Sequence, residues 1–459
     1  MKVMIIGLDC AEPSLVLERW RDELPVLASL MERGAYGTLT SVVPPITVPA
    51  WSCMMSSRTP GDLGIYGFRN RADHSYDGLF IANGAAVKEP RLWDYATRAG
   101  KPSIVLGVPG TYPPRPLNGV MVSCFLTPSL ESQYTYPPLL KREVEKAVGE
   151  YRFDCTDFRT DDKDDLLRQV YEMTDRRFAL AEHLLTSHPW QLFAMVEMGP
   201  DRMYHGFWKH MDTGHRDHVP GNPYENAILD YHRYLDGKLA GVLAHADDDT
   251  AVFVVSDHGG KRMDGGIRVN EWLRREGFLA TMREPVGVEK LADVGIDWAR
   301  TTAWSEGGYY ARVFLNVAGR EPEGTIPPGD VPVVRDRLRS LLEAIPDDRG
   351  EPLGTRVFVP EELYPQVNGV APDLIVHFGD LRWRSVGTIG GDDGIHVFEN
   401  DTGPDDANHA QDGLFVLVAP GVEPGPREGA QLLDVAPTAL TLLGIPVPAA
   451  MRGTSLLGT

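Results

Sequence analysis

The sequence predicts an α/β protein built on a mostly parallel central sheet. Three observations lead to this: continuous apolar runs of strand length, helical patterns between them, and polar residues directly after several runs. Continuous apolar runs are typical of strands that are buried on both faces of a parallel sheet. In such sheets ligands bind beyond the carboxyl ends of the strands. We therefore expect the functional residues along that edge.

The first expected strand is the run from Met1 to Leu8. Similar runs predict further strands at residues 103–107, 191–197, 250–256, 373–378 and 413–419. Amphipathic patterns predict helices within residues 138–187 and 226–245. A last helix is expected from residue 432, ended by Gly444 and Pro446. Strands that alternate with helices in this way are the pattern of a parallel sheet.

Residues 261–371 have a different sequence pattern, with short mixed segments broken by Gly and Pro. We expect this stretch to be an inserted cap that interrupts a catalytic core formed by residues 1–260 and 372–459. Loops of such a cap would set substrate choice. No repeat of 20 to 50 residues is visible, which disfavours solenoids and propellers.

The chain has 459 residues, with 45 Lys and Arg against 65 Asp and Glu, a formal net charge of −20. This acidity argues against a nucleic-acid polymer as partner, although a bound metal could still attract a small anion. Four cysteines without CxxC spacing indicate reduced thiols. The apolar start is too short for a signal segment, and no uncharged apolar run reaches 18 residues. We expect a cytoplasmic protein without a membrane partner.

Residues with metal-binding chemistry follow two of the expected strands. Asp9 stands at the end of the first strand. Asp201 and His205 follow the run at 191–197, and a helix beginning near Pro200 would place both on one face. Each has an ordinary alternative, since Asp caps helices and His is common on surfaces.

A third group follows the strand at 250–256. Asp257 and His258 precede two glycines, which let the backbone turn sharply beneath a ligand, although Asp257 alone could be a helix cap. His409 stands four residues before the strand at 413–419, where a short loop could return it to the same edge. Carboxylates and imidazoles together suit divalent metals, especially zinc. Six such residues at matching strand ends predict a metal site.

The order of these motifs resembles the alkaline phosphatase superfamily, specifically the type I phosphodiesterase/nucleotide pyrophosphatase family. The resemblance spans nearly the whole chain and is carried by GLDC at 7–10, PPITVPAWSC from residue 44, MGPDRMYHGFW from 198, VVSDHGG from 254 and NHAQDGLFVLVAPG from 408. It implies a three-layer sandwich with an inserted cap and two divalent metal ions, zinc above all, with manganese as the alternative.

The resemblance also divides the ligands between the two metals. It implies that Asp201, His205 and His409 hold one of them. It implies that the other is surrounded by Asp9, Asp257, His258 and the hydroxyl oxygen of Thr47.

Thr47 matches the position of the family nucleophile, at the start of a helix in a Thr-x-Pro turn. A threonine hydroxyl needs a lowered pKa to attack, which metal coordination provides, and a helix N-terminus offers donors for phosphate oxygens. The resemblance implies attack by Thr47 on phosphorus, a covalent phosphothreonine and its hydrolysis. The local sequence alone favours a turn residue before a proline at Thr47, and the full ligand set reverses that preference.

Substrate recognition is the least specified part of the sequence. Many members of the family carry an Asn about twenty residues after the nucleophile, where this chain has Phe68; Asn70 or Arg69 could take that role. Lys261, just after the metal-binding loop, could meet phosphate or be an ordinary surface charge.

We expect a metal-dependent phosphoric ester hydrolase, a phosphodiesterase or nucleotide pyrophosphatase acting on a small phosphate ester. The alternative is a phosphomonoesterase with the same machinery, which an arginine near the phosphate would favour. A non-catalytic binding protein on this scaffold is a third possibility, against which the complete ligand set argues. The sequence leaves the physiological substrate, the metal and the oligomeric state open.

Overall fold

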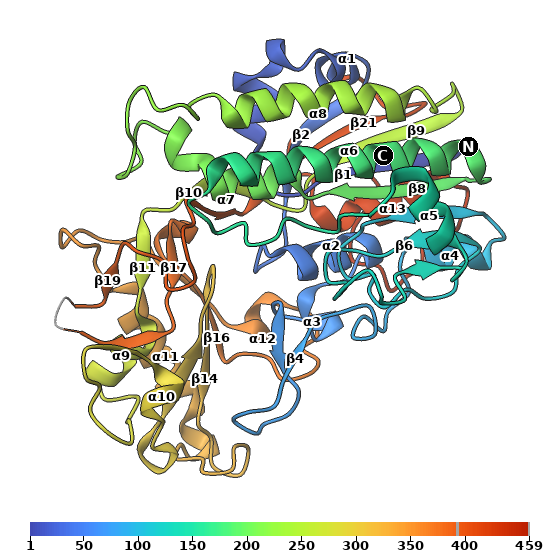
Figure 1. The fold of residues 1–459 in the computed structure, drawn as a ribbon. Helices are drawn as coiled ribbons and strands as arrows, with labels where there is room; N and C mark the ends of the chain where they lie inside the picture. The colour runs from blue at the N-terminus through green and yellow to red at the C-terminus, as the bar shows by residue number, and fades with distance from the viewer. Residues whose placement is uncertain (392–393, 458–459) are drawn as a thin grey trace.

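The computed structural model describes residues 1–391 and 394–457, and a nine-stranded sheet forms the centre of that part of the chain (Figure 1). In sheet order its strands are β22 (Gly425–Pro426), β2 (Ala35–Thr40), β21 (Asp412–Val418), β9 (Thr250–Val255), β1 (Lys2–Leu8), β8 (Leu192–Glu197), β5 (Ser103–Leu106), β6 (Gly119–Val122) and β7 (Thr135–Tyr136). The five strands from β9 to β6 are mutually parallel. The predicted fold class is confirmed.

Helices cover both faces of this sheet and complete three layers (Figure 1). One face carries α1 (Pro25–Arg33), α6 (Lys163–Ser187) and α8 (Ala227–Leu243), and the other carries α2 (Thr47–Ser56), α4 (Leu92–Arg98) and α13 (Val435–Leu442). The remaining core helices are α3 (Pro60–Leu63), α5 (Leu140–Val148) and α7 (Gly199–Met211). Among the described residues, no helix combines the length and apolar character needed to cross a membrane.

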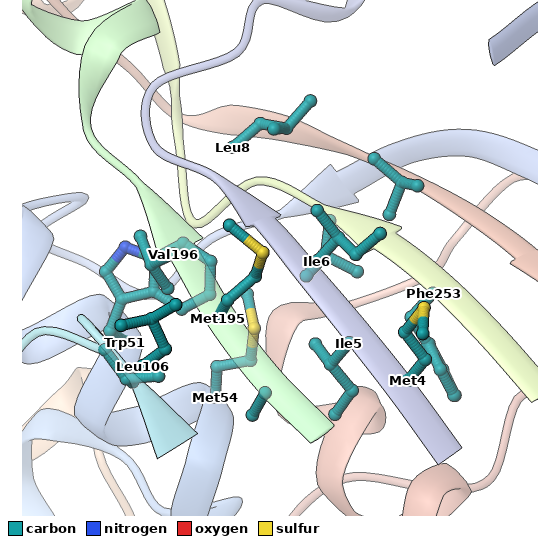
Figure 2. Packing of buried hydrophobic residues seen from close by; sticks show 14 of the residues in the cluster. Met4, Ile5, Ile6, Leu8, Trp51, Met54, Leu106, Met195, Val196 and Phe253 are labelled. Atoms are coloured by element: carbon teal, nitrogen blue, oxygen red, sulfur yellow. The ribbon is translucent and has the colours of Figure 1, made fainter. Parts of the chain in front are cut away.

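The central strand β1 is buried on both faces, and Val3, Met4, Ile5 and Ile6 have no exposed surface. Figure 2 shows Trp51 of α2 in this core, close to Val196. Gly7 permits this close packing, because a Cβ there would lie 2.3 Å from the Trp51 ring. A glycine at the end of β1 therefore lets α2 lie directly against the sheet beside Asp9.

The cap is built on a second sheet in the order β13-β14-β16-β15, with its own hydrophobic core. Its strands are β13 (Ala303–Glu306), β14 (Ala311–Leu315), β15 (Arg356–Phe358) and β16 (Leu374–His377), and its helices are α9 (Val269–Arg275), α10 (Leu291–Val294), α11 (Val331–Glu343) and α12 (Pro360–Leu363). Figure 1 shows this unit beside one end of the central sheet.

Short two- and three-stranded sheets connect and extend these units. They contain β3 (Arg69–Arg71) with β4 (Leu79–Ile81), β10 (Gly259–Arg262) with β20 (Ala407–Ala410), β12 (Val288–Lys290) with β18 (Thr388–Gly390), and β11 (Gly265–Ile267) between β17 (Trp383–Ser385) and β19 (His396–Val397).

The run at 373–378 is a strand, but it lies in the cap and not in the central sheet. Its strand β16 pairs with β14 and β15, and the cap's core extends to Trp383. The chain therefore returns to the central sheet later than the expected boundary after residue 371. A continuous apolar run shows that a strand is buried on both faces, but it does not show which sheet buries it.

Candidate metal centre and active site

Three buried carboxylates meet where β1, β8 and β9 end. Because these strands are parallel neighbours, the residues that follow them lie at one edge. Asp9 and Asp257 have no exposed surface and Asp201 is 2% exposed. Helix α7 begins at Gly199 with a proline in its first turn, which suits that position. Its geometry brings His205 Nε2 to 3.3 Å from Asp201 Oδ1.

His409 reaches the same edge from a strand, not from a short loop. It lies on β20, opposite Gly260 of β10. Strand β21 runs antiparallel to β9, so the segment that precedes β21 already lies at the carboxyl edge of the parallel strands. His409 Nε2 is 3.4 Å from His205 Nε2, and its Nδ1 is 2.8 Å from the carbonyl oxygen of Pro45, just before the Thr47 turn.

The described ligand atoms fall into two overlapping groups, each within 4.8 Å. One group is Asp201, His205 and His409, and the other is Asp9, Asp201 and His258. Asp201 thus belongs to both groups. Asp257 adjoins the second group, with its Oδ2 3.2 Å from His258 Nε2. The structure brings together all six residues that the sequence placed at strand ends.

Thr47 is the first residue of α2 and is 3% exposed. Its Oγ1 lies 3.4 Å from His258 Nε2, so the hydroxyl is part of the same cluster. At a helix N-terminus the first backbone N–H groups have no intrahelical acceptor, and they favour anions. The structure therefore combines a hydroxyl, the N-terminus of a helix and the metal-type ligands in one place.

The donor set fits divalent cations. Asp9 Oδ1, Asp201 Oδ1 and Asp257 Oδ2 are buried and have no hydrogen-bond partner among the described residues. Unpaired carboxylate oxygens are costly to bury unless a cation neutralises them. Three such oxygens beside imidazole nitrogens are the ligand types that zinc takes. Residues 9, 201 and 257 therefore fit the metals that the sequence predicts.

The pKa values of the cluster follow its burial. Burial and the neighbouring charge of Asp201 raise the pKa of Asp9 well above its ordinary value, and burial and Asp9 do the same to the pKa of Asp257. Burial lowers the pKa of His258 to about 4, and burial together with His258 lowers that of His409. Neutral imidazoles are the form that binds metal.

Asp201 and His205 are supported by charged neighbours that the sequence did not reveal as a set. Arg202 bridges Asp201 and Asp154, with Nε 2.7 Å and Nη2 2.6 Å from the Asp154 oxygens. His205 Nδ1 lies 2.6 Å from Asp405 Oδ1. Burial opposes protonation of His205, but Asp405 and Asp201 outweigh it and raise its pKa to about 9.

Trp51 and Asp405 are two further contacts of the cluster that sequence reasoning missed. Trp51 Nε1 donates to Asp9 Oδ2 over 2.6 Å, although in the sequence it reads as a core aromatic. Asp405 stands in an acidic segment four residues before His409. Its position among several acids is the one signal that could have suggested it.

The three residues proposed for substrate contact lie in different surroundings. The Asn70 amide is used within its own turn, accepting from Tyr66 N and donating to Gly67 O. Lys261 Nζ donates to the backbone and carboxylate oxygens of Asp380, 2.8 and 3.0 Å away. Arg69 instead lines a pocket next to the cluster. Of the three, Arg69 is the one in the wall of this pocket.

That pocket has a volume of about 440 Å³ and contains Ile46, Arg69 and Tyr309 in its wall. Ile46 directly precedes Thr47. The ring of Tyr309 packs on His409, with centroids 4.4 Å apart, and on His205 at 5.0 Å. The pocket therefore adjoins the cluster on its histidine side.

Comparisons with solved structures define the class of fold. Phosphonoacetate hydrolase from Sinorhizobium meliloti 1021 aligns with a TM-score of 0.61 and 17% identity over 96% of this chain and 95% of that chain. Human ectonucleotide pyrophosphatase/phosphodiesterase 5 aligns with a TM-score of 0.56 and 14% identity over 99% and 97%. An inactive threonine-to-alanine variant of murine ectonucleotide pyrophosphatase/phosphodiesterase 5, in complex with AMP, gives the same TM-score, identity and coverage as the human protein. The protein has the fold of the alkaline phosphatase superfamily.

The profile of the type I phosphodiesterase/nucleotide pyrophosphatase family matches residues 3–407. The chain belongs to this family, as its motifs predicted, and is a phosphoester hydrolase. No curated protein sequence matched the chain.

Proposed function

We propose that the protein is a phosphodiesterase that cleaves small phosphate esters or nucleotide pyrophosphates through a covalent phosphothreonine on Thr47. The observation that carries this proposal is the position of Thr47. Its hydroxyl lies at the N-terminus of α2 and 3.4 Å from His258, beside the unpaired oxygens of Asp9 and Asp257.

Two divalent ions, zinc or alternatively manganese, complete this site. We assign one ion to Asp201, His205 and His409. We assign the other to Asp9, Asp257, His258 and the hydroxyl oxygen of Thr47. Bound there, such ions supply positive charge that lowers the pKa of the hydroxyl and stabilises negative charge on the reacting phosphoryl group.

The protein's own groups bind and orient the reactants. The backbone N–H groups of Thr47 and Val48 in the first turn of α2 hold a phosphoryl oxygen, since Pro49 has no N–H to offer. Thr47 Oγ1 gives its proton to water and attacks phosphorus, while the bond to the leaving oxygen breaks and that oxygen departs with a proton from water. A second water molecule then hydrolyses the phosphothreonine, which releases the phosphorylated product and restores the Thr47 hydroxyl. Trp51 fixes one oxygen of Asp9, which leaves the other directed at the cluster. The inactive threonine-to-alanine variant of the murine relative supports a threonine in this role.

A phosphomonoesterase remains the second candidate, and Arg69 in the neighbouring pocket is the observation that favours it. A monoester presents one more negative charge than a diester, and a guanidinium pairs with that charge.

Steady-state hydrolysis of bis-p-nitrophenyl phosphate and p-nitrophenyl phosphate tests the proposal. We expect the wild type to prefer the diester, Thr47→Ser to retain activity, and Thr47→Ala to lose it with both metals still bound. Preference for the monoester would favour the second candidate. Undiminished activity of Thr47→Ala would rule out the covalent mechanism.

We also propose a cytoplasmic location and a small phosphate ester as partner. Cys10, Cys53, Cys124 and Cys155 are all buried and unpaired, which supports a reducing compartment.

A further inference from the structure

The pocket beside the cluster gathers positive charge in a protein whose formal net charge is −20. Four arginines are in its wall: Arg69, Arg159, Arg312 and Arg384. The carboxylates in the same wall are Glu306 and Asp401. The pocket therefore carries an excess of positive charge next to the site where a phosphate ester would react.

One of these arginines is already neutralised. Arg159 Nε donates to Asp405 Oδ2 over 2.9 Å, and its Nη2 donates to the Tyr309 hydroxyl. Asp405 in turn holds His205. Arg159 therefore supports the cluster and is not free to recognise a ligand.

Among the described residues, the other three arginines make no carboxylate contact shorter than 3.9 Å. Arg384 is 6% exposed, and its Nε and Nη1 have no hydrogen-bond partner within the described part of the chain. Its contacts with Asp401 and Asp405 are both 3.9 Å long. The Arg312 guanidinium donates to the backbone oxygen of Arg69.

A buried guanidinium with unused donors is costly unless an acceptor reaches it. Its planar donors match the two oxygens of a carboxylate or phosphate group. Tyr309 separates this pocket from His409 by a single aromatic ring, and Ile46 connects it to Thr47. An anion on the arginines would therefore lie next to the reacting phosphoryl group.

We propose that this pocket is a subsite for a second oxyanion of the substrate, a carboxylate or phosphate joined to the reacting phosphoryl group by a short linker. The proposal rests on the proposed function, because it takes the cluster at Thr47 as the reacting centre. It narrows the substrate class from phosphate esters in general to those that carry a further anionic group.

Competitive inhibition of bis-p-nitrophenyl phosphate hydrolysis by three matched phosphonates tests this subsite. Butylphosphonate has no second anion, 3-phosphonopropionate carries a carboxylate, and ethylenediphosphonate carries a second phosphonate. The free metal concentration is kept the same in all assays. We expect at least one of the two inhibitors with a second anionic group to have an inhibition constant about tenfold below that of butylphosphonate, as a charge-assisted hydrogen bond predicts. Which of the two binds more tightly distinguishes a carboxylate from a phosphate.

Variants at the arginines connect this preference to the pocket. In Arg384→Gln and Arg69→Gln, the ratio of the inhibition constant of butylphosphonate to that of the preferred inhibitor should fall towards one. Because Arg69 is exposed, the Arg69→Gln variant should keep the fold even if the variant at the buried Arg384 does not. Arg382→Gln is the matched control, because Arg382 is outside the pocket and contacts Asp264 at 3.9 Å. Arg382→Gln should keep the same ratio of inhibition constants as the wild type.

Two results would overturn the subsite: equal inhibition constants for all three phosphonates in the wild type, or a preference that survives in both pocket variants. If the metal-loaded protein hydrolyses neither aryl ester, the proposed function fails. Calorimetric binding of the same phosphonates to that protein then tests the subsite without turnover, with the same expected ratios.

Discussion

The two halves of the candidate site treat buried charge in different ways. In the half formed by Asp201, His205 and His409, which we call the arginine-backed half, the protein supplies its own counter-charges. Burial raises the pKa of Asp201, but His205 and Arg202 more than offset this and hold it below its ordinary value. Arg202 and His205 therefore compensate most of the negative charge of this half, although Asp201 Oδ1 has no hydrogen-bond partner among the described residues.

The half formed by Asp9, Asp257 and His258, which we call the carboxylate half, is not balanced. Its two aspartates form no ion pair with a described Lys or Arg, and their pKa values are raised by burial. The comparison teaches that the arginine-backed half can be assembled by folding alone. The carboxylate half needs a cation to be stable in its ionised form.

The largest expected effect comes from breaking the carboxylate half. Asp257→Asn should lower the turnover of bis-p-nitrophenyl phosphate by about 10³-fold or more, because Thr47 loses the positive charge that activates it. Metal analysis should show one ion per chain in place of two. Asp412→Asn, at the half-buried start of β21, should leave both values unchanged; a similar loss there would indicate a general structural effect.

The next effect concerns the support of the arginine-backed half. Asp405→Asn should weaken the binding of its metal by about 10- to 100-fold, because Asp405 orients His205. Equilibrium titration with zinc measures this loss. Asp406→Asn is the control, since its side chain contacts Lys209 at 3.4 Å. Equal zinc affinity in the Asp405 variant and the wild type would contradict the role of Asp405.

Thermal unfolding of the metal-free protein compares the two halves directly. Asp257→Asn should raise the melting temperature by a few degrees, since it removes a buried carboxylate that has no counter-charge. Asp201→Asn should lower it, since it leaves Arg202 and His205 with less compensation. Each change corresponds to about 1–3 kcal/mol. Shifts of the same sign in both variants would show that the halves do not differ in this way.

The smallest expected effect comes from Tyr309, whose ring lies between the cluster and the neighbouring pocket. Tyr309→Phe keeps the ring on His409 but loses the hydrogen bond from Arg159 and the long 3.5 Å one that the hydroxyl donates to Asp405. We expect kcat/KM to fall by about two- to tenfold, the worth of one hydrogen bond. In Tyr364→Phe, which loses a hydrogen bond to Val43 instead, kcat/KM should not change. A Tyr309→Phe loss of a hundredfold or more would mean that the hydroxyl has a direct catalytic role.

The sequence predicted the central sheet and the strand-end residues because both depend on local patterns. The apolar runs at 2–8, 192–197 and 250–255 form neighbouring parallel strands, and parallel neighbours necessarily end at one edge. Asp9 and Asp257 could therefore be placed without knowledge of side-chain contacts.

The features that the sequence did not predict depend on contacts between distant segments. Asp405 meets His205 across 200 residues of sequence, and Trp51 meets Asp9 only because Gly7 lets α2 approach β1. The strand at 374–377 has the same apolar character as the central strands, yet it lies in the cap. Periodicity shows that a residue is buried, but not which segment buries it.

A crystal structure of the zinc-loaded protein, with anomalous data collected at the zinc edge, tests the central claim most directly. The account predicts two peaks about 4 Å apart. One should lie among Asp201, His205 and His409, and the other between Asp9 and Asp257 beside Thr47. A single peak in the arginine-backed half, with Asp9 and Asp257 hydrogen-bonded to each other or to water, would contradict the account.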